Sequence, residues 1–377
     1  MRVLHATADW KWTGPAEPML LLIEGLRRRG HEVDLACPPP PSSELRSLAG
    51  EARKRGIEPR FGLTRGRGMR LFRDAPDARR MRTWLEAGDY EVVHTWHSRD
   101  HGLALRAAHR RRRDGSTALV RSVPGALAPS WLPWNRWLLG PGCDGLLCVG
   151  RRNATRATGL RGGRPLAGPL GAVDTLRFRP ASVDPGPGLE RLGVPASARG
   201  HLVGVVARLQ RHRRFDLLLD AFARLADADP RAHLLILGRG TYEEEVVRGP
   251  VRARGLADRV TLAGYREEDY VDVLRGLDVL TFLVPGSDGT CRAVLEAAGC
   301  GIPCVATRRG ALPEIVCDGE TGLLVDEEPK DLERAWRSLI EQIPLRQEMG
   351  RAARRRAQQV FSVDRLARCV EDLYEAS

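Results

Sequence analysis

The carboxylates Asp288 and Glu296 lie on either side of a turn and the start of a short helix. The turn contains Gly289, which lets a ligand approach the backbone closely, and Thr290, which can cap the helix that begins at Cys291. Free N–H groups and the helix dipole at such an N-terminus favour an anion such as a diphosphate. The two carboxylates could hold sugar hydroxyls beside it, so this segment predicts a site for a phosphate and a sugar together.

Two arginines offer the opposite charge. Arg208 and Arg213 follow the apolar run 201–207, which is typical of a buried strand, so we expect both at its carboxyl end. Fixed cations there could stabilise the negative charge that develops on a departing phosphate. The alternative is a solvated basic loop, because the chain is rich in arginine.

The elements that must position these residues follow an alternating strand and helix pattern. In the first half the expected strands are 3–6, 31–37, 91–95, 118–123 and 145–149, and the expected helices are 18–29, 101–112 and 131–139. In the second half the expected strands are 201–207, 233–237, 260–263, 279–283 and 304–307, and the expected helices are 216–226, 242–254, 268–274 and 291–300. Only helix signals follow Val325. This order predicts an α/β protein with parallel sheets.

The 377 residues have room for two domains. We predict two doubly wound, Rossmann-like lobes: an N-terminal domain at 1–180, a linker rich in Pro and Gly at 181–199, and a second domain at 200–355. The remaining segment, 356–377, is expected to be a helix that packs back on the first lobe. Folds of this kind bind ligands at the carboxyl ends of their strands.

Composition narrows the class of partner. The net charge of +12 comes almost wholly from arginine and would attract nucleotide-sugars, an acidic membrane surface or nucleic acid. The eight cysteines have no CxxC spacing and mostly lie in apolar runs, which indicates buried thiols in a reduced, cytoplasmic compartment. No apolar run approaches the length of a membrane span, and the N-terminus lacks a secretory signal, so we expect a soluble or peripheral protein.

The candidate residues belong to an ordered series of motifs that resembles the family-4 glycosyltransferases of the GT-B fold. The matching segments are Thr13-Gly14, 29–33, 92–94, 171–180, 207–213, 233–238, 263–266, 288–296, 310–315 and 318–325. The resemblance implies two lobes that face each other across a cleft. It also implies an enzyme that moves a sugar, with retention at the anomeric carbon, from a nucleoside diphosphate to a hydroxyl acceptor. We expect a UDP-linked donor and neither a metal nor a covalent cofactor.

The resemblance assigns roles to the donor-site residues. It implies that Glu296 accepts hydrogen bonds from the donor ribose, and that Asp288, where the family usually has glutamate, contacts the sugar hydroxyls near the reacting carbon. The main-chain N–H groups of Gly289, Thr290 and Cys291 would add contacts to the donor. The alternatives are a solvent-facing helix glutamate for Glu296 and a plain Asp-Gly turn for Asp288.

The phosphate contacts follow in the same way. Arg208 and Arg213 would neutralise the leaving diphosphate, with Arg213 and Arg214 standing where the family usually has lysine and then glycine. Gly14, the one glycine that remains of a usual pair, would let the first lobe close over the phosphates. The resemblance implies departure and attack on one face of the sugar, with the leaving phosphate itself taking the acceptor proton. For Gly14 the alternative is a purely structural turn.

The acceptor side is less well specified. Many family members have a histidine where Pro124 stands, and we expect His97 and Arg99, just after strand 91–95, to contact the acceptor or sugar instead; His101 is a further candidate. A lone histidine is more often a satisfied loop residue. The tryptophans at 131, 134 and 137 could line an acceptor groove, dip into a membrane interface or pack in the core.

Two other motifs do not carry a function. Asp227 and Asp229 have DxD spacing but follow a helix and precede a strand, which is the wrong end for a site. Gly238 and Gly240 lack the third glycine and the acidic partner of a dinucleotide loop.

The remaining interpretations are a non-catalytic protein that binds nucleotide-sugars and a nucleic-acid binder, for which there is no motif. We expect a glycan or lipid-linked acceptor of the cell envelope and peripheral association with an anionic membrane.

Overall fold

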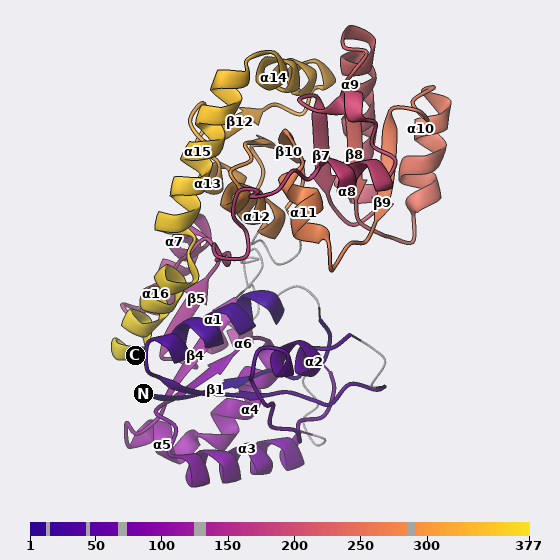
Figure 1. Ribbon diagram of the computed structural model, residues 1–377. Coiled ribbons are helices and arrows are strands. Elements are labelled where there is room, and N and C mark those ends of the chain that lie inside the picture. Colours follow the sequence, from indigo (N-terminus) through magenta and orange to yellow (C-terminus); the bar gives the residue numbers. More distant parts are fainter. Residues whose placement is uncertain (13–15, 43–45, 67–73, 124–132, 286–290) are drawn as a thin grey trace. The chain divides into compact units, whose positions relative to one another are not determined.

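The computed structural model describes residues 1–12, 16–42, 46–66, 74–123, 133–285 and 291–377. These residues form two compact units, which Figure 1 draws in colours that follow the sequence. Unit 1 contains Met1–Ala172 and Val363–Ser377, and unit 2 contains Val173–Pro285 and Cys291–Ser362. The last helix of the chain therefore belongs to the same unit as the N-terminus.

Unit 1 is built on a parallel sheet with the order β2-β1-β3-β4-β5-β6. Its strands are β1 (Arg2–Ala6), β2 (Glu32–Ala36), β3 (Val92–Thr95), β4 (Ala118–Val123), β5 (Gly145–Cys148) and β6 (Leu166–Ala167). Its helices are α1 (Ala16–Arg28), α2 (Leu48–Arg53), α3 (Ala75–Gly88), α4 (Ser98–Ala107), α5 (His109–Arg113), α6 (Pro133–Leu139), α7 (Arg151–Arg161) and α16 (Val363–Glu375).

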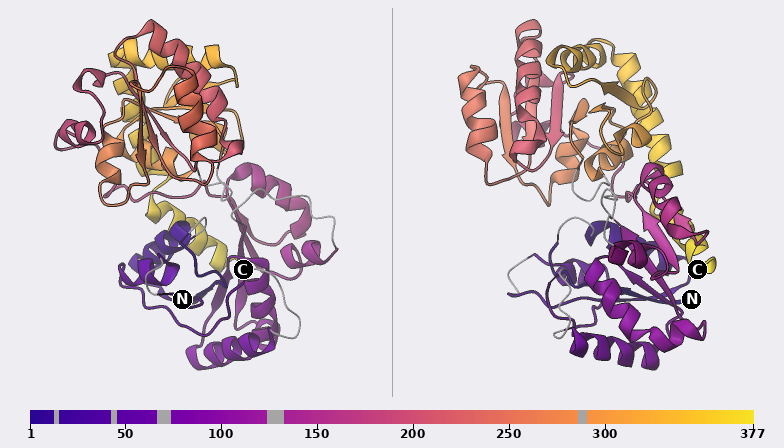
Figure 2. Two further views of the ribbon diagram at one scale, coloured as in Figure 1. Left: turned by 90° about the vertical axis from the view of Figure 1, so that its right-hand side faces the viewer. Right: turned by 180° about the vertical axis from the view of Figure 1, so that it is seen from behind.

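Helices cover both faces of this sheet, because its strands are apolar on both sides (Figure 2). One core contains α1, α2 and α16, and the other contains α3 and α4. Helix α16 lies against α1 at a point of close approach: a Cβ added to Gly25 would stand 2.8 Å from the Cβ of Ala367. The small residue on α1 is what allows the C-terminal helix to pack there.

Unit 2 repeats the plan with the strand order β12-β11-β10-β7-β8-β9. Its strands are β7 (Leu202–Val206), β8 (His233–Leu237), β9 (Val260–Gly264), β10 (Val279–Phe282), β11 (Cys304–Thr307) and β12 (Gly322–Val325). Its helices are α8 (Gly186–Arg191), α9 (Phe215–Ala228), α10 (Gly249–Ala253), α11 (Tyr270–Arg275), α12 (Arg292–Cys300), α13 (Leu312–Ile315), α14 (Pro329–Glu341) and α15 (Ile343–Val360). Three short turns, η1 (Ala196–Ala198), η2 (Arg211–Arg213) and η3 (Glu244–Arg248), complete it.

Both sheets confirm the predicted doubly wound α/β class. In each, the chain adds strands in one direction and then returns to add strands on the other side of the first, so that β1 and β3 are neighbours in unit 1 and β7 and β10 in unit 2. The carboxyl ends of two such neighbouring strands form the topological switch point, where ligands bind in folds of this kind. The fold therefore marks one edge of each sheet as a candidate site.

The structure departs from the expected elements in a few places. Helix 101–112 is two helices, α4 and α5. The expected helix 242–254 is one uninterrupted helical segment, in which the π-helical η3 leads directly into α10. Pro250 lies at the start of α10, and its missing N–H accounts for the local change in hydrogen bonding. The expected linker contains α8 and η1, and α3 and α7 were not expected.

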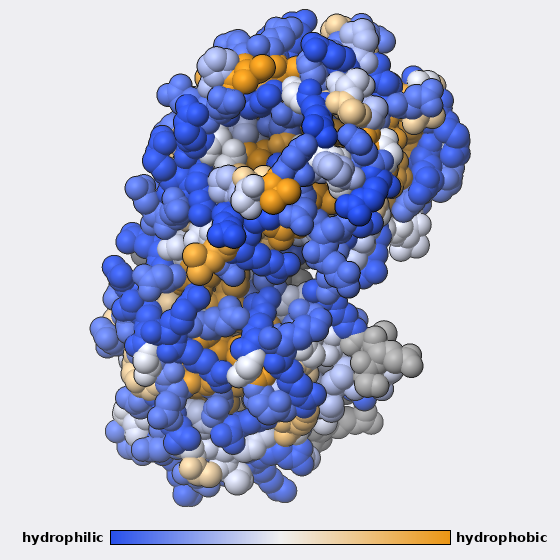
Figure 3. Space-filling view, in the orientation of Figure 1, coloured by the Kyte–Doolittle hydropathy of each residue, from blue (hydrophilic) through white to orange (hydrophobic). Residues whose placement is uncertain are grey.

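The visible surface is mostly hydrophilic, with apolar residues in small, separate groups (Figure 3). Within the described ranges, none of the helices combines the length and the apolar character that crossing a bilayer requires.

Candidate functional site

The loops after β7 and β10 meet at the switch point of unit 2. The two strands pair in parallel, with Val203 opposite Val279 and Val205 opposite Thr281, so their carboxyl ends lie at one edge. Beyond that edge, Nη1 of Arg213 donates a hydrogen bond to the backbone oxygen of Val284 at 2.6 Å. The half-buried Arg213 is thus fixed between the two loops that the topology identifies.

Arg208 lies two residues beyond β7, at the same edge, and its side chain is exposed. Its guanidinium forms no hydrogen bond or ion pair with any described part of the chain. An arginine that ends a buried strand without an acidic partner keeps its full capacity to bind an anion. The structure therefore places both predicted arginines at the carboxyl end of β7, one anchored and one available.

The residue that follows Arg213 has an unusual backbone conformation. Arg214 follows η2 with φ of 58° and ψ of 41°, in the left-handed region that favours glycine. Its side chain pairs with Glu327, which lies beyond β12. The family usually has glycine at this position, and here an arginine adopts the backbone conformation that glycine favours.

Glu296 lies in the second turn of α12, buried, with a relative exposure of 5 %. Its Oε2 accepts a hydrogen bond from the Tyr270 hydroxyl at 2.6 Å, and its Oε1 lies 3.0 Å from Nε of Arg292. Burial, together with the adjacent carboxylate of Glu296, raises the pKa of Tyr270 well above its usual range, so the phenol remains a donor. Two partners hold the carboxylate in one orientation, and each oxygen keeps a lone pair for a ligand.

Helix α12 starts from a strained residue. Cys291, its N-cap, is buried and has φ of 47° and ψ of 44°. The helix therefore begins one residue later than expected, and its N-cap is Cys291 instead of Thr290. Left-handed backbone at a non-glycine residue is concentrated at functional sites. Of the other predicted donor-site residues, Asp288, Gly289, Thr290 and Gly14 lie outside the described residues.

Gly238 and Gly240 support the loop that carries Arg208. A Cβ at Gly238 would lie 1.8 Å from the backbone oxygen of Ala207, and one at Gly240 would lie 2.1 Å from that of Leu209. Leu209 N also donates to the oxygen of Arg239 at 3.2 Å. These glycines are therefore required by the close approach of two backbones, which explains the motif without a dinucleotide.

In unit 1, His97 lies at the corresponding edge, just beyond β3. It is the N-cap of α4, and its Nδ1 lies 3.1 Å from Oδ2 of Asp100 and 3.3 Å from Oγ1 of Thr7, which follows β1. The ring is half-buried, and no described residue contacts its Nε2 through a hydrogen bond. The structure thus orients His97 through one nitrogen and leaves the other for a ligand.

Arg99 and His101 have a different environment. Arg99 has a relative exposure of 1 % and pairs with Asp74 and Asp77 at 2.7 Å each. His101 is fully buried between Oγ1 of Thr95 and the backbone oxygen of Gly142. Both side chains are satisfied within the fold, so neither is placed to contact an acceptor.

Tyr270 and Asp100 were not singled out in the sequence. Asp100 could have been found, because an acidic residue three positions after a helix N-cap is a capping-box signal. Tyr270 has no comparable signal, since its contact with Glu296 joins residues from two helices, α11 and α12.

Asp229 pairs with His201 after α9, as expected for a turn. Trp137 is the part of the tryptophan series whose side chain is described, and it is exposed.

Comparisons with known proteins cover most of the chain. The glycosyltransferase family 4 pattern matches residues 15–162, and the pattern of glycosyl transferases group 1 matches residues 195–356. A D-inositol 3-phosphate glycosyltransferase of Corynebacterium jeikeium is 36 % identical over 55 % of this chain and 50 % of its own length. The lipopolysaccharide core biosynthesis mannosyltransferase LpsB of Rhizobium meliloti is 27 % identical over 76 % of this chain and 83 % of its own. The chain spans about half the length of the first of these relatives.

Solved structures have the same fold. Anabaena HepE, in complex with UDP and glucose, superposes with a TM-score of 0.79 at 19 % identity and full coverage of both chains. A glycosyltransferase of Rickettsia africae superposes with a TM-score of 0.82 at 15 % identity, over 99 % of this chain and 97 % of its own. At such identities the likeness concerns the fold.

Proposed function

Because the chain belongs to glycosyltransferase family 4 and has the GT-B fold, we propose that it moves a sugar from a nucleoside diphosphate to a hydroxyl acceptor with retention. The observation that carries the proposal is the meeting of the β7 and β10 loops through Arg213 and Val284. Arg208 and Arg213 follow β7 and α12 follows β10, so this contact supports a donor site with two guanidiniums and a helix start near the switch point of unit 2. A UDP-linked donor is our first choice.

The geometry suggests how the donor is held. Glu296, oriented by Tyr270, accepts hydrogen bonds from the ribose, and the N-terminus of α12 faces the diphosphate. When the bond between the anomeric carbon and the leaving phosphate oxygen breaks, Arg208 and Arg213 stabilise the charge that develops on the phosphate. The acceptor oxygen then bonds to the same face of the carbon, and its proton passes to the leaving phosphate.

The acceptor in this proposal is a glycan or lipid-linked intermediate of the cell envelope. Two relatives support this class by their names, a lipopolysaccharide core mannosyltransferase and a phosphatidylinositol monomannoside mannosyltransferase. His97, with its oriented ring, is the candidate acceptor contact of unit 1. The proposal includes action in the cytoplasm, with peripheral association at an anionic membrane.

The test is release of the nucleotide from purified enzyme supplied with labelled UDP-, GDP- and ADP-sugars, with and without EDTA. We expect turnover with one donor and no effect of EDTA. Arg208→Gln should lower the rate roughly 100-fold, since a charge-stabilising donor is lost. The matched control is Arg224→Gln, which removes an exposed arginine from α9.

Two outcomes would reject the proposal. Tight binding of a nucleotide-sugar without turnover under any acceptor would identify a non-catalytic binding protein. Equal activity of Arg208→Gln and Arg224→Gln would show that the Arg208 guanidinium does not take part in the reaction. Weak binding of nucleic acid that modest salt abolishes would be nonspecific and would leave the glycosyltransferase interpretation intact.

A further inference from the structure

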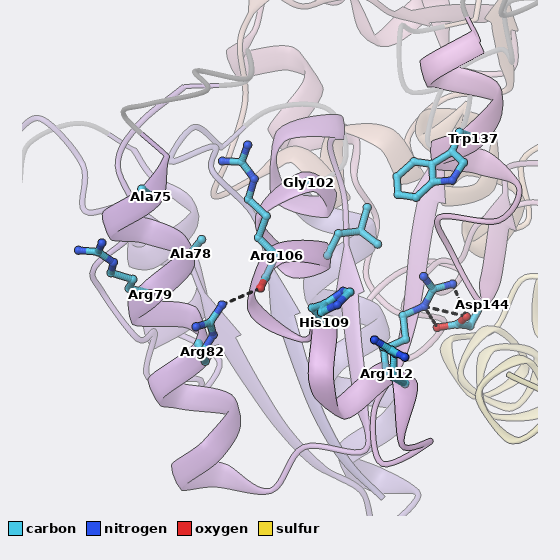
Figure 4. A pocket seen from close by; sticks show the side chains of 12 residues that line it. Ala75, Ala78, Arg79, Arg82, Gly102, Arg106, His109, Arg112, Trp137 and Asp144 are labelled. Atoms are coloured by element: carbon cyan, nitrogen blue, oxygen red, sulfur yellow. Dashed lines mark hydrogen bonds and ion pairs between the residues drawn. The ribbon is translucent and has the colours of Figure 1, made fainter.

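A large open hollow lies on the helical face of unit 1, on residues that the proposed sugar transfer does not use. It has a volume of about 910 Å³ and lies among α3, α4, α5 and α6 (Figure 4). Its lining includes Asp144, which precedes β5 and therefore lies toward the amino end of that strand. The hollow extends along the outer side of these helices, and His97 is not among the residues that line it.

Arginines from three helices surround this hollow. Arg79 and Arg82 come from α3, Arg106 from α4, and Arg112 and Arg113 from α5. All but Arg112 are exposed.

The positive charge of the hollow is largely uncompensated. The lining has one carboxylate, Asp144, and Arg112 neutralises it through a contact of 2.7 Å. Arg79 and Arg113 have no ion pair with any described residue, and Arg82 donates to a neutral backbone oxygen, that of Arg106. Several cations on one face with one neutralised anion attract a polyanionic partner.

The same face has apolar and aromatic surface. Ala75, Ala78 and Leu105 contribute to the lining of the hollow, and Trp137 of α6 lies at its rim in Figure 4 with 40 % of its surface exposed. Arg136, beside it, is exposed as well. Tryptophan and arginine together on an exposed helix are typical of surfaces that contact the boundary between lipid headgroups and acyl chains.

We propose that this face, formed by α3, α4, α5 and α6, is the surface on which the protein docks to an anionic phospholipid bilayer. The arginines contact headgroup phosphates, and Trp137 enters the interface. The docking face gives the membrane association of the proposed function a set of residues, and its role in the cell rests on that proposed function. The binding itself requires neither donor nor acceptor.

The experiment is sedimentation of the full-length protein with vesicles of phosphatidylcholine alone or with a minor fraction of phosphatidylglycerol. We expect binding to the anionic vesicles alone, weakened by salt. The triple variant Arg79→Gln, Arg82→Gln, Arg113→Gln should bind about 100-fold more weakly, because each basic residue near an anionic surface contributes to the affinity. Trp137→Ala should weaken binding by a factor that hardly changes with salt, since its contribution is apolar and is not screened.

The matched control removes the same charge from unit 2, with Arg224→Gln, Arg351→Gln and Arg355→Gln, which are all exposed. Equal loss of binding in both triple variants would overturn the proposal, because net charge alone would then explain it. A second result would also overturn it. If inorganic phosphate released the protein from vesicles at a much lower ionic strength than chloride does, the face would be a site for a soluble phosphate. Sugar transfer to a soluble acceptor should survive in the first triple variant, so failure of docking and failure of the proposed activity are distinguishable.

Discussion

At the scale of single residues, the chemistry of the proposed donor site depends on how a few charged groups are held. Arg208 was predicted from its place after the strand β7, because the ends of parallel strands in a sheet converge. Glu296 was predicted from the resemblance of its helix, α12, to the family's motif. Their partners were not predictable in the same way. Tyr270 orients Glu296 from another helix, and such a contact depends on tertiary packing that local sequence patterns do not encode.

Tyr270→Phe tests the orientation of Glu296. Loss of the 2.6 Å hydrogen bond should free the carboxylate and raise the KM for the nucleotide-sugar about tenfold, with a smaller effect on kcat, since a hydrogen bond to a charged group contributes about 1.5–3 kcal/mol. Steady-state kinetics would measure both constants. Tyr242→Phe is the control, because no described residue bonds to its hydroxyl and its ring packs under Arg211. An unchanged KM in Tyr270→Phe would exclude this role.

Arg214 allows a test of backbone strain that separates it from charge. Arg214→Ala and Arg214→Gly both remove the contact with Glu327, but only glycine is free of steric cost at φ of 58°. We expect the glycine variant to be more stable than the alanine variant by about 1 kcal/mol, measured by urea unfolding. The reverse order would mean that the turn relaxes when the arginine is lost.

At the scale of elements, the sequence located strands better than polar helices. The strands β4, β8 and β11 match the expected ranges because each is a short, mostly apolar run between turn residues. Helices α3 and α7 were missed because few of their residues are buried, so their apolar periodicity is weak. The segment that places Arg208 depends on a different feature, the close contact of the β7 and β8 loops.

Gly240→Ala tests that contact. Its new Cβ would overlap the backbone oxygen of Leu209, so the Arg208 loop must move, and we expect a loss of about 1–3 kcal/mol in stability together with weaker UDP binding. Gly159→Ala in α7 is the matched control. No atom of the described chain lies within 4 Å of a Cβ there, so alanine should raise stability by about 0.5–1 kcal/mol through helix propensity. Calorimetry and titration with UDP measure the two effects. Normal UDP binding by Gly240→Ala would show that the loop tolerates the shift.

At the scale of the whole molecule, unit 1 contains a cluster of buried histidines that joins distant parts of the chain. His94 of β3 bonds through Nδ1 to the Tyr374 hydroxyl of α16 at 2.6 Å and through Nε2 to Ser122 of β4 at 2.7 Å. His5 of β1 lies 3.3 Å from the same tyrosine hydroxyl. No single segment of sequence indicates this cluster, because its members are up to 369 positions apart.

These histidines make unit 1 sensitive to acid. Burial lowers the pKa of His5 and His101 to about 3 and that of His94 well below its usual value. The unfolded chain binds protons at these groups below about pH 6.5 and the folded chain does not, so the stabilisation is complete above pH 6.5 and is lost as the pH falls below it.

Three such groups should lower the free energy of unfolding by about 4 kcal/mol between pH 7.5 and 5.5. In unit 2, where burial lowers the pKa of His233 to about 4, the corresponding loss is roughly 1.4 kcal/mol. Hydrogen exchange followed by mass spectrometry at the two pH values, corrected for the intrinsic exchange rate, would report each unit separately. We expect β1, β3 and α16 to lose protection first, because Tyr374 fastens the last helix to the histidine cluster. Equal loss of protection in the two units would contradict this assignment and would place the acid-sensitive groups elsewhere.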